Sequence, residues 1–447
     1  MKTRVIIVRH GQSTYNQLKR IQGHCDESVL TPSGEQQAAQ VAQALRGIPL
    51  QAVWSSPLQR ARRTADIIAE TLATPTPRYS DLLKEVSLPL WEGMPFTEAE
   101  ALYPEAFQQW CQDPANLVMR LPQGEATLDF YPIREIYQQA TQAWAHLLEQ
   151  HRGETILVVA HSAINRALIA TALGLGPESF HTLHQSNCNI SVLNFADGWQ
   201  GPVEVEAMNL TSHLGAPLPE IRPSHRGPRM LLVRHGETEW NRQGRFQGQI
   251  DVPLNDTGRT QGEKAAGFLH PIPLDAAYTS SMARPRETAE IILQHHPHLQ
   301  LQSLDDLREI SHGEWEGLYK GDIEENYPGL LQQWQAAPET VQMPGGENLE
   351  QVWERSVRAW RQLVTSHSRA DQRQTVLVVA HDAVNKALLC HVLGLGPEAF
   401  WRFKQGNGAV SVIDYPDGVD SQPVLTSANI TIHLSGSVLD KTAAGAL

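Results

Sequence analysis

Apolar residues fall into two patterns that alternate along the chain. Short runs such as residues 4–8 (RVIIV) and 155–159 (TILVV) are rich in β-branched residues and almost entirely apolar. Runs of this length are too short for helices, and their continuous apolar character is typical of central strands that are covered on both faces. They therefore predict buried strands.

Between these runs, apolar residues recur every three or four positions, as they do on one face of a helix. One such helix follows Ser56, which we expect at its N-cap with Pro57 at its first position. Its apolar positions are Leu58, Ala61, Ala65, Ile68 and Leu72. A second helix is predicted over residues 31–45 and a third over 164–172. Strands that alternate with helices predict an open α/β fold with a mainly parallel sheet.

The two halves of the chain repeat one another. Residues 5–16 (VIIVRHGQSTYN) match 231–241 (LLVRHGETEWN), and further matches follow in the same order. His10 pairs with His235 and His161 with His381, so the offset drifts only from 225 to 220 residues. A solenoid unit spans about 20 to 50 residues, so this period indicates a duplicated whole domain.

The predicted domains cover residues 1–214 and 229–434, and each has its own sheet. A linker is predicted over 215–228, because this stretch (GAPLPEIRPSHRGP) carries the Pro and Gly residues that interrupt regular structure. A C-terminal tail is predicted over 435–447.

The charge balance excludes a protein built on nonspecific attraction to polyanions. The 447 residues include 36 Lys and Arg against 49 Asp and Glu, which gives a formal net charge of −13. We therefore expect neither a nucleic acid nor an anionic membrane as partner. Any anionic ligand must be held by a local cluster of cations.

The cysteines and the N-terminus favour a cytoplasmic protein. Cys25, Cys111, Cys188 and Cys390 are scattered without a C-x-x-C spacing, which predicts neither a disulfide framework nor a thiolate zinc site. The N-terminal segment has no export signal, and no stretch approaches the roughly 20 apolar residues of a membrane span. No oligomeric state follows from the sequence.

Two Arg, two His and one Glu recur in register in both halves, with both His directly after predicted strands and one Arg at the start of a predicted helix. They are Arg9, His10, Arg60, Glu85 and His161 in the first half, and Arg234, His235, Arg284, Glu309 and His381 in the second. The forks of two Arg side chains match the oxygens of a phosphoryl group. Arg60 also lies in the first turn of its helix, where free N–H groups favour an anion. A lone histidine is more often an ordinary residue, but the repeated set predicts a phosphoryl site.

The set resembles the histidine phosphatase superfamily, also called the phosphoglycerate mutase-like family, over nearly the whole chain. The likeness lies in RHG with a downstream Asn, an S-x-x-x-R helix start, L-x-E-x-x-x-x-x-W-E-G and a late A-H after a strand. It implies two tandem three-layer α/β/α domains. It also implies a phosphomonoesterase that works through a phosphohistidine on a small phosphorylated metabolite, without a metal or another cofactor.

The resemblance also implies a role for each residue. His10 and His235 would carry the phosphoryl group, and Glu85 and Glu309 would donate the proton. The implied phosphate-binding residues are Arg9, Asn16, Arg60 and His161 in the first half, and Arg234, Asn241, Arg284 and His381 in the second. We expect the late histidines, His161 and His381, to be cationic. The nucleophilic histidines are expected to be held through their second ring nitrogen by a backbone carbonyl. The pKa of each Glu is expected to be raised by a partly dry pocket.

The halves differ around this shared set. The second keeps PGGEN (344–348), whereas the first has PQGEA (122–126), and His312 is replaced in the first by Leu88. Both pockets are expected to bind phosphate, with the N-terminal one weakened or altered in specificity. Pro285 is expected to start its helix late or distort its first turn.

Other functions remain as alternatives. Cofactor-dependent mutases of this family carry E-R-H-Y-G after the proton-donor strand, but the matching stretches here are EVSLPL and EISHGE. Their lack of that Arg and Tyr favours a phosphatase of the broad-specificity and sugar-phosphatase branch over a mutase. One half could instead be a noncatalytic phospholigand-binding or scaffold module. The histidine-rich segments 24–27 and 295–298 have no paired metal-ligand spacing and are interpreted as solvated loops.

Overall fold

The computed structural model describes residues 2–124, 126–368 and 372–443. The chain divides into two compact units, Met1–Ala216 and Pro217–Leu447, which we call the first and second unit. This division falls inside the stretch 215–228, whose bounds as a linker stay a prediction. Of the predicted tail, residues 444–447 lie outside the described residues.

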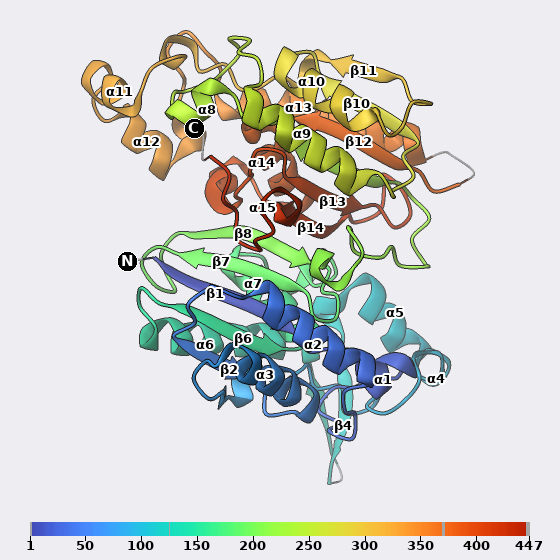
Figure 1. Ribbon diagram of the computed structural model, residues 1–447. Helices are drawn as coiled ribbons and strands as arrows, with labels where there is room; N and C mark the ends of the chain where they lie inside the picture. Colours follow the sequence, from blue (N-terminus) through green and yellow to red (C-terminus); the bar gives the residue numbers. More distant parts are fainter. Residues whose placement is uncertain (1, 125, 369–371, 444–447) are drawn as a thin grey trace. The chain divides into compact units, whose positions relative to one another are not determined.

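The first unit is built on a mixed sheet with the strand order β8-β7-β1-β6-β2-β3 (Figure 1). Strands β1, β6, β2 and β3 pair in parallel, and β7 is antiparallel to both β1 and β8. Their bounds are β1 Thr3–Arg9, β2 Ala52–Ser55, β3 Arg78–Tyr79, β6 Thr155–Ala160, β7 Ile190–Phe195 and β8 Val203–Leu210. The predicted mainly parallel sheet is confirmed.

The second unit repeats this sheet with the order β11-β10-β12-β9-β13-β14. Here β13 is the antiparallel strand, paired with β9 and β14. The bounds are β9 Arg229–Arg234, β10 Ala276–Ser280, β11 Leu301–Leu304, β12 Thr375–Ala380, β13 Val410–Asp414 and β14 Val424–Ile430. Every residue of β12 is buried, as its continuous apolar run predicts.

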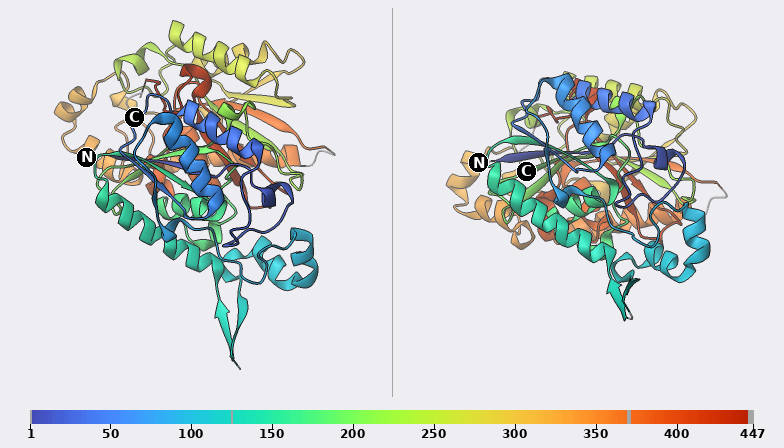
Figure 2. Two further views of the ribbon diagram at one scale, coloured as in Figure 1. Left: turned by 60° about the horizontal axis from the view of Figure 1, so that its bottom comes forward. Right: turned by 90° about the horizontal axis from the view of Figure 1, so that it is seen from below.

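Helices cover both faces of each sheet and give three layers (Figures 1 and 2). In the first unit the helices α2 and α3 pack together on one face, and α6 and α7 pack together on the other. In the second unit the corresponding pairs are α9 with α10 and α13 with α14. Their bounds are α2 Pro32–Ala44, α3 Gln59–Leu72, α6 Pro132–Gln150, α7 Ser162–Ala172, α9 Asp256–Leu269, α10 Ala283–Leu293, α13 Leu349–Ser368 and α14 Asp382–Val392.

Shorter elements surround the carboxyl ends of the parallel strands or lie at the periphery. The short helices are α1 Thr14–Gln17, α4 Phe96–Leu102, α5 Pro104–Gln112, α8 Glu239–Gln243, α11 Lys320–Asn326, α12 Leu330–Ala336 and α15 Ile432–Ser435. The first unit also has a separate hairpin of β4 Met119–Gln123 and β5 Ala126–Phe130, which extends away from its body (Figure 2). Among the described helices, none combines the length and apolar character needed to cross a membrane.

The register of the parallel strands brings distant residues to one edge. Arg9 at the end of β1 faces Ala160 at the end of β6, and Ser55 of β2 faces Val159 of the same strand. Because parallel strands end at the same edge of a sheet, the residues that follow them become neighbours. The same register pairs Arg234 with Ala380 in the second unit.

All three predicted helices are found, but the predicted start of the first is wrong. The helix α2 begins after Thr31, whose side chain accepts a hydrogen bond from the amide of Gly34 as an N-cap, and it ends at its C-cap Leu45. The predicted third helix coincides with α7. The predicted cap of α3 is wrong, because this helix begins at Gln59 after Leu58, and Ser56 lies outside it.

Pro285 does not delay its helix. The helix α10 begins at Ala283, and α3 begins at Gln59, which is the equivalent position under the offset of 224. Pro285 is the third residue of α10, where a backbone N–H has no partner within the helix, so the missing donor costs nothing there. Arg284 keeps its place in the first turn.

Candidate active site

The first histidine of each repeated set directly follows a central strand. His10 follows β1 and His235 follows β9, with 1% and 2% of their surfaces exposed. In each ring Nδ1 lies 2.7 Å from the backbone oxygen of the next residue, Gly11 or Gly236. Because a carbonyl oxygen only accepts, Nδ1 carries the proton and Nε2 keeps its lone pair. The expected anchoring of the second ring nitrogen by a backbone carbonyl is confirmed.

The glycine after each histidine lets the loop touch the following helix. A Cβ on Gly11 would lie 2.3 Å from the backbone oxygen of Gly34 in α2, and a Cβ on Gly236 would lie 2.3 Å from that of Gly258 in α9. No other residue fits this approach without moving the loop. The loop that anchors the histidine ring is therefore fixed against a helix.

The helix arginines, Arg60 and Arg284, have no exposed surface. Each donates from both terminal nitrogens to backbone carbonyls of one loop, which lies between α1 and α2 in the first unit and between α8 and α9 in the second. The acceptors are Gly23 and Cys25 in the first unit, and Gly248 and Ile250 in the second. Arg284 also donates from Nε to Nε2 of His235 at 3.2 Å. Burial lowers the pKa of Arg284 to about 10, so its guanidinium stays charged at neutral pH.

Arg9 and Arg234, the last residues of β1 and β9, are held by backbone carbonyls at the pocket edge. Arg9 donates from Nη1 to the oxygen of Gln185 at 2.8 Å. Arg234 donates in the same way to the oxygen of Gln405. A guanidinium fixed in this way keeps its remaining N–H groups in a set direction, which suits an oxyanion.

Asn16 is held in the first unit by a capping box at the start of α1. Its Oδ1 accepts from the backbone amide of Ser13 at 3.2 Å and from Nδ2 of Asn187 at 3.1 Å. Asn187 also donates to the backbone oxygen of His10 at 3.0 Å. The corresponding residues of the second unit are Asn241, Thr238 and Asn407. Asn187 and Asn407 were not predicted, although the Q-x-N pattern at 185–187 and 405–407 recurs in register.

The two glutamates lie at the N-termini of the helices that follow the late histidines. Oε1 of Glu85 accepts from the amides of Ala163 at 2.9 Å and Val86 at 3.0 Å. Glu309 accepts from Ala383 and Ile310 in the same way. Glu309 is 3% exposed, and burial is the main reason why its pKa is raised. The expected raised pKa is therefore found in the second unit.

The late histidines, His161 and His381, lie beside the first ones. The ring centroids of His10 and His161 are 5.1 Å apart, and those of His235 and His381 are 5.2 Å apart. Nε2 of His161 lies 2.8 Å from Oγ of Ser56, and Nε2 of His381 lies 2.9 Å from Oγ of the equivalent serine, Ser280. Ser56 thus contacts the pocket histidine instead of capping a helix.

All four pocket histidines are neutral at neutral pH. Burial is the largest cause that lowers their pKa well below 6.5, and the nearby Arg60 or Arg284 is the next. Neutrality suits the nucleophilic role expected of His10 and His235. The expectation of a cationic late histidine is not supported for the pocket as it stands, because burial and, next, the nearby Arg60 or Arg284 lower the pKa of this histidine.

The second pocket carries a buried acid that the first lacks. Asp382, the residue after His381, lies 3.4 Å from Nη1 of Arg234 and 2.8 Å from Nζ of Lys386. Ser162 takes its place in the first unit. Asp382 also contributes to the raised pKa of Glu309, after burial. The two pockets therefore differ in electrostatics as well as in sequence.

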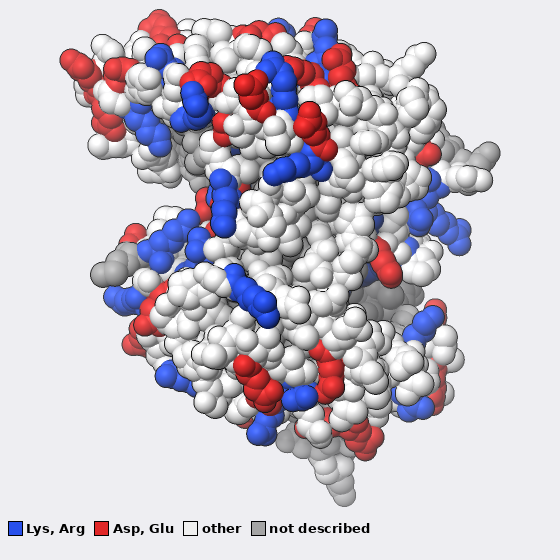
Figure 3. All heavy atoms as spheres, viewed as in Figure 1, with Lys and Arg blue, Asp and Glu red and all other residues white. Residues whose placement is uncertain are grey.

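Positively charged side chains lie on the surface as well as in the pockets. On the face drawn in Figure 3, Lys and Arg are interspersed with Asp and Glu over the surface of each unit.

Within the described residues, no group of three or more His, Cys, Asp or Glu side chains is placed to hold a metal ion. The pocket arginines described above include the buried Arg60, Arg234 and Arg284.

Comparison with known proteins identifies the family. A model described as the histidine phosphatase superfamily (branch 1) matches residues 5–208 and again residues 230–430. The chain belongs to the histidine phosphatase superfamily. It is a phosphoric monoester hydrolase of that superfamily with two tandem copies of the phosphatase domain.

Two plant relatives of this histidine phosphatase match it from end to end. The 2-carboxy-D-arabinitol-1-phosphatase of Triticum aestivum is 34% identical and covers 96% of this chain and 86% of its own length. The probable 2-carboxy-D-arabinitol-1-phosphatase of Arabidopsis thaliana is 32% identical, with 96% and 88% covered. Among solved structures, the alpha-ribazole phosphatase from Shigella flexneri is 25% identical with a TM-score of 0.41, covering 45% of this chain and 96% of its own.

Proposed function

We propose that this histidine phosphatase removes phosphate from a small phosphorylated sugar acid, with 2-carboxy-D-arabinitol 1-phosphate as the candidate substrate. The support is that the wheat relative named for this reaction matches both units over 96% of the chain. Within the pocket, the supporting observation is the placement of His235 between Arg284 and the carbonyl of Gly236.

The first step is attack by a ring nitrogen on phosphorus. Nε2 of His235 forms the P–N bond while the bond from phosphorus to the ester oxygen breaks. Arg234 and Arg284 neutralise the charge on the equatorial oxygens, which is the main demand of phosphoryl transfer. Because these cations belong to the chain itself, we propose that the step needs no metal.

The departing alkoxide takes its proton from Glu309. A carboxylic acid serves this purpose when its pKa is raised toward neutrality, and burial of Glu309 shifts its pKa in that direction. Water then attacks the phosphohistidine, and the Glu309 carboxylate accepts its proton. Inorganic phosphate leaves, and both His235 and Glu309 return to their starting states.

We propose the same roles for the equivalent residues of the first unit. His10 is the nucleophile and Glu85 the proton donor. The phosphate-binding residues of the first unit are Arg9, Asn16, Arg60 and His161. In the second unit Asn241 and His381 bind phosphate as Asn16 and His161 do in the first. The first pocket has the same backbone anchors but lacks the acid at Asp382 and has Leu88 for His312. We infer that it is slower or differs in its preferred ester.

Single substitutions of the nucleophiles test this division. His235→Ala is expected to abolish most release of phosphate from 2-carboxy-D-arabinitol 1-phosphate, and His10→Ala to remove a smaller share or the activity toward another sugar phosphate. The double variant is expected to be inactive. A His10→Ala protein that matches the parent on a broad panel of phosphate esters would make the first unit noncatalytic.

A further inference from the structure

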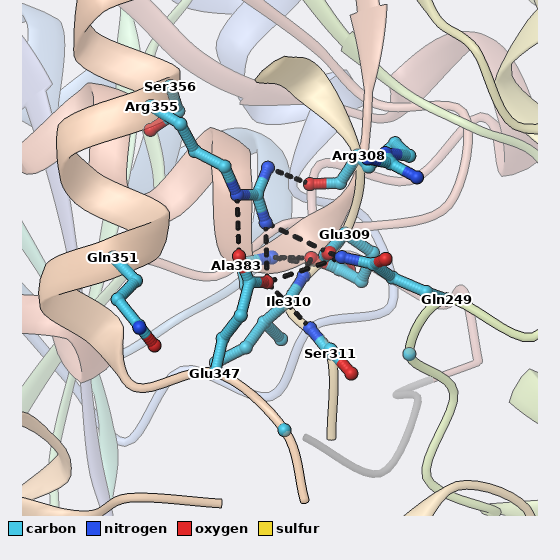
Figure 4. A network of polar contacts seen from close by, with 12 residues as sticks. Gln249, Arg308, Glu309, Ile310, Ser311, Glu347, Gln351, Arg355, Ser356 and Ala383 are labelled. Carbon is cyan, nitrogen blue, oxygen red and sulfur yellow. Dashed lines mark hydrogen bonds and ion pairs between the residues drawn. The ribbon is translucent and has the colours of Figure 1, made fainter. Parts of the chain in front are cut away.

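Arg355 on α13 fixes the segment that carries Glu309. Its two terminal nitrogens donate to the backbone oxygens of Asp306, Arg308 and Glu309, all of which lie just before or at the proposed acid (Figure 4). Its remaining donors form a two-pronged contact with the carboxylate of Glu347, at 2.9 Å for both Nε and Nη2. All five N–H groups of this guanidinium are thus used.

Glu347 holds the same segment on the other side of Glu309. Its Oε2 accepts from the backbone amide of Ser311 at 2.9 Å, and its own amide donates to the backbone oxygen of Ser311 at 2.8 Å. Oε2 also accepts a hydrogen bond from Nε2 of Gln249 at 3.3 Å. The same nitrogen of Gln249 donates to the backbone oxygen of Glu309. The residue between the two anchors is Ile310, whose amide donates to the Glu309 carboxylate.

The first unit differs at the position of Arg355. Gln139 takes the place of Arg355 and donates to the backbone oxygens of Leu82 and Lys84, at 3.0 and 2.9 Å. An amide cannot form the two-pronged ionic contact that a guanidinium forms. The residue that aligns with Glu347 is Glu125, which lies outside the described residues.

We propose that Glu347 and Arg355 form a positioning pair that holds Glu309 in line with the leaving oxygen and thereby adapts the second unit to esters whose alcohols are poor leaving groups. This inference rests on the proposed role of Glu309 as the acid. The proposed role requires no contact between either residue of the pair and the substrate. Both act by fixing the backbone on the two sides of Glu309.

The dependence on the leaving group separates this role from general support of the fold. An alkyl ester such as glycerol 3-phosphate needs a proton donor, whereas 4-nitrophenyl phosphate releases a stable anion and needs little. In the His10→Ala background, Arg355→Gln and Glu347→Gln are expected to lower kcat/KM for the alkyl ester about 10- to 100-fold, since a small displacement of a reacting group costs that much. For 4-nitrophenyl phosphate the loss is expected to be about twofold at most.

A neighbouring arginine provides the matched control. Arg358 lies on the same helix and pairs with Asp306 at 3.1 Å, but its side chain is 55% exposed. Arg358→Gln is expected to change neither rate. Glu309→Gln should show the same dependence on the leaving group as Arg355→Gln, and the double variant Glu309→Gln with Arg355→Gln should be no slower than Glu309→Gln alone.

Other results would overturn the inference in distinguishable ways. A positioning role is excluded if Arg355→Gln and Glu347→Gln lower kcat/KM equally for both esters. It is also excluded if neither variant lowers kcat/KM. Both results leave the proposed function intact. If Glu309→Gln itself lowers both rates equally, Glu309 is not the acid, and the proposed mechanism fails together with the inference. Should Arg355→Gln not fold, Glu347→Gln alone decides the question.

Discussion

Arg284 donates from Nε to Nε2 of His235 at 3.2 Å, so a buried cation lies against the ring nitrogen that keeps its lone pair. In the first unit the equivalent nitrogen, Nε of Arg60, is buried without a hydrogen-bond partner among the described residues. Each arginine is held by two backbone carbonyls, which fix its guanidinium in the pocket. Preorganised charge of this kind lowers the barrier to phosphoryl transfer.

Replacing Arg284 by lysine is expected to lower kcat/KM strongly. An ammonium group carries the charge but cannot reach the carbonyls of Gly248 and Ile250 and the phosphate together. In the His10→Ala background we expect a loss of about 100-fold or more, the scale seen when one preorganised donor is removed. Steady-state kinetics with a sugar phosphate measure it, and a change of less than about threefold would show that charge alone suffices.

The charge at Asp382 is expected to set the alkaline limit of the second pocket. Asp382 adds to the effect of burial in raising the pKa of Glu309, and Glu309 must be protonated to donate to an alkoxide. Asp382 pairs with Lys386, so the test replaces both residues, as Asp382→Ser with Lys386→Arg. The double variant then has the same residues at these two positions as the first unit, which has Ser162 and Arg166. The alkaline limb of kcat/KM for an alkyl ester should move to lower pH. A limb that stays in place or moves to higher pH would remove Asp382 from the mechanism.

Acid is expected to destabilise the protein through its buried neutral histidines. Burial lowers the pKa of His312 to about 3, below its value near 6.5 in an unfolded chain. Between these two pKa values the unfolded state therefore binds more protons than the folded state. The contribution of neutral His312 to the free energy of unfolding is complete above pH 6.5 and is lost as the pH falls toward 3. The slope for one such group is about 1.4 kcal/mol per pH unit.

His312→Leu copies Leu88 and isolates this contribution. Both ring nitrogens of His312 are buried and have no hydrogen-bond partner in the part of the chain that the structure describes, and the ring packs against Phe246, Trp315 and Trp334. The variant is expected to lose less of its free energy of unfolding between pH 6.5 and 5 than the parent. Urea unfolding at several pH values measures this, and parallel slopes for both proteins would contradict it.

Excess chelator is expected to leave turnover unchanged. The buried arginines supply the positive charge that a metal would otherwise supply to the phosphoryl oxygens. The control is addition of magnesium or zinc after chelation, which should restore nothing because nothing was lost. Activity that disappears with chelator and returns with one metal would overturn the metal-free mechanism.

The sequence predicts the fold and the composition of the pockets well because both depend on simple periodicities. Alternating strands and helices predict the layered domains, and residues that follow parallel strands must meet at one edge. His10 and His161 therefore become neighbours although 151 positions separate them. The duplication adds a second, independent copy of every observation.

The errors arise where tertiary contacts compete with local preferences. Ser56 before Pro57 has the local pattern of an N-cap, but the end of β2 places its hydroxyl beside His161 from 105 residues away. Arg355 lies in an ordinary amphipathic helix, and nothing local distinguishes it from Arg358. Only the packing of α13 against the segment that carries Glu309 separates the two arginines.

Trapping the phosphoenzyme tests the central claim most directly. After rapid acid-free quenching of the enzyme with its sugar phosphate, peptide mass spectrometry is expected to find phosphate on His235, and on His10 with its preferred ester. The label should be stable to alkali, labile to acid, and absent from His235→Ala at that position. A catalytically active enzyme that carries no phosphohistidine, or carries it at another residue, would contradict the account.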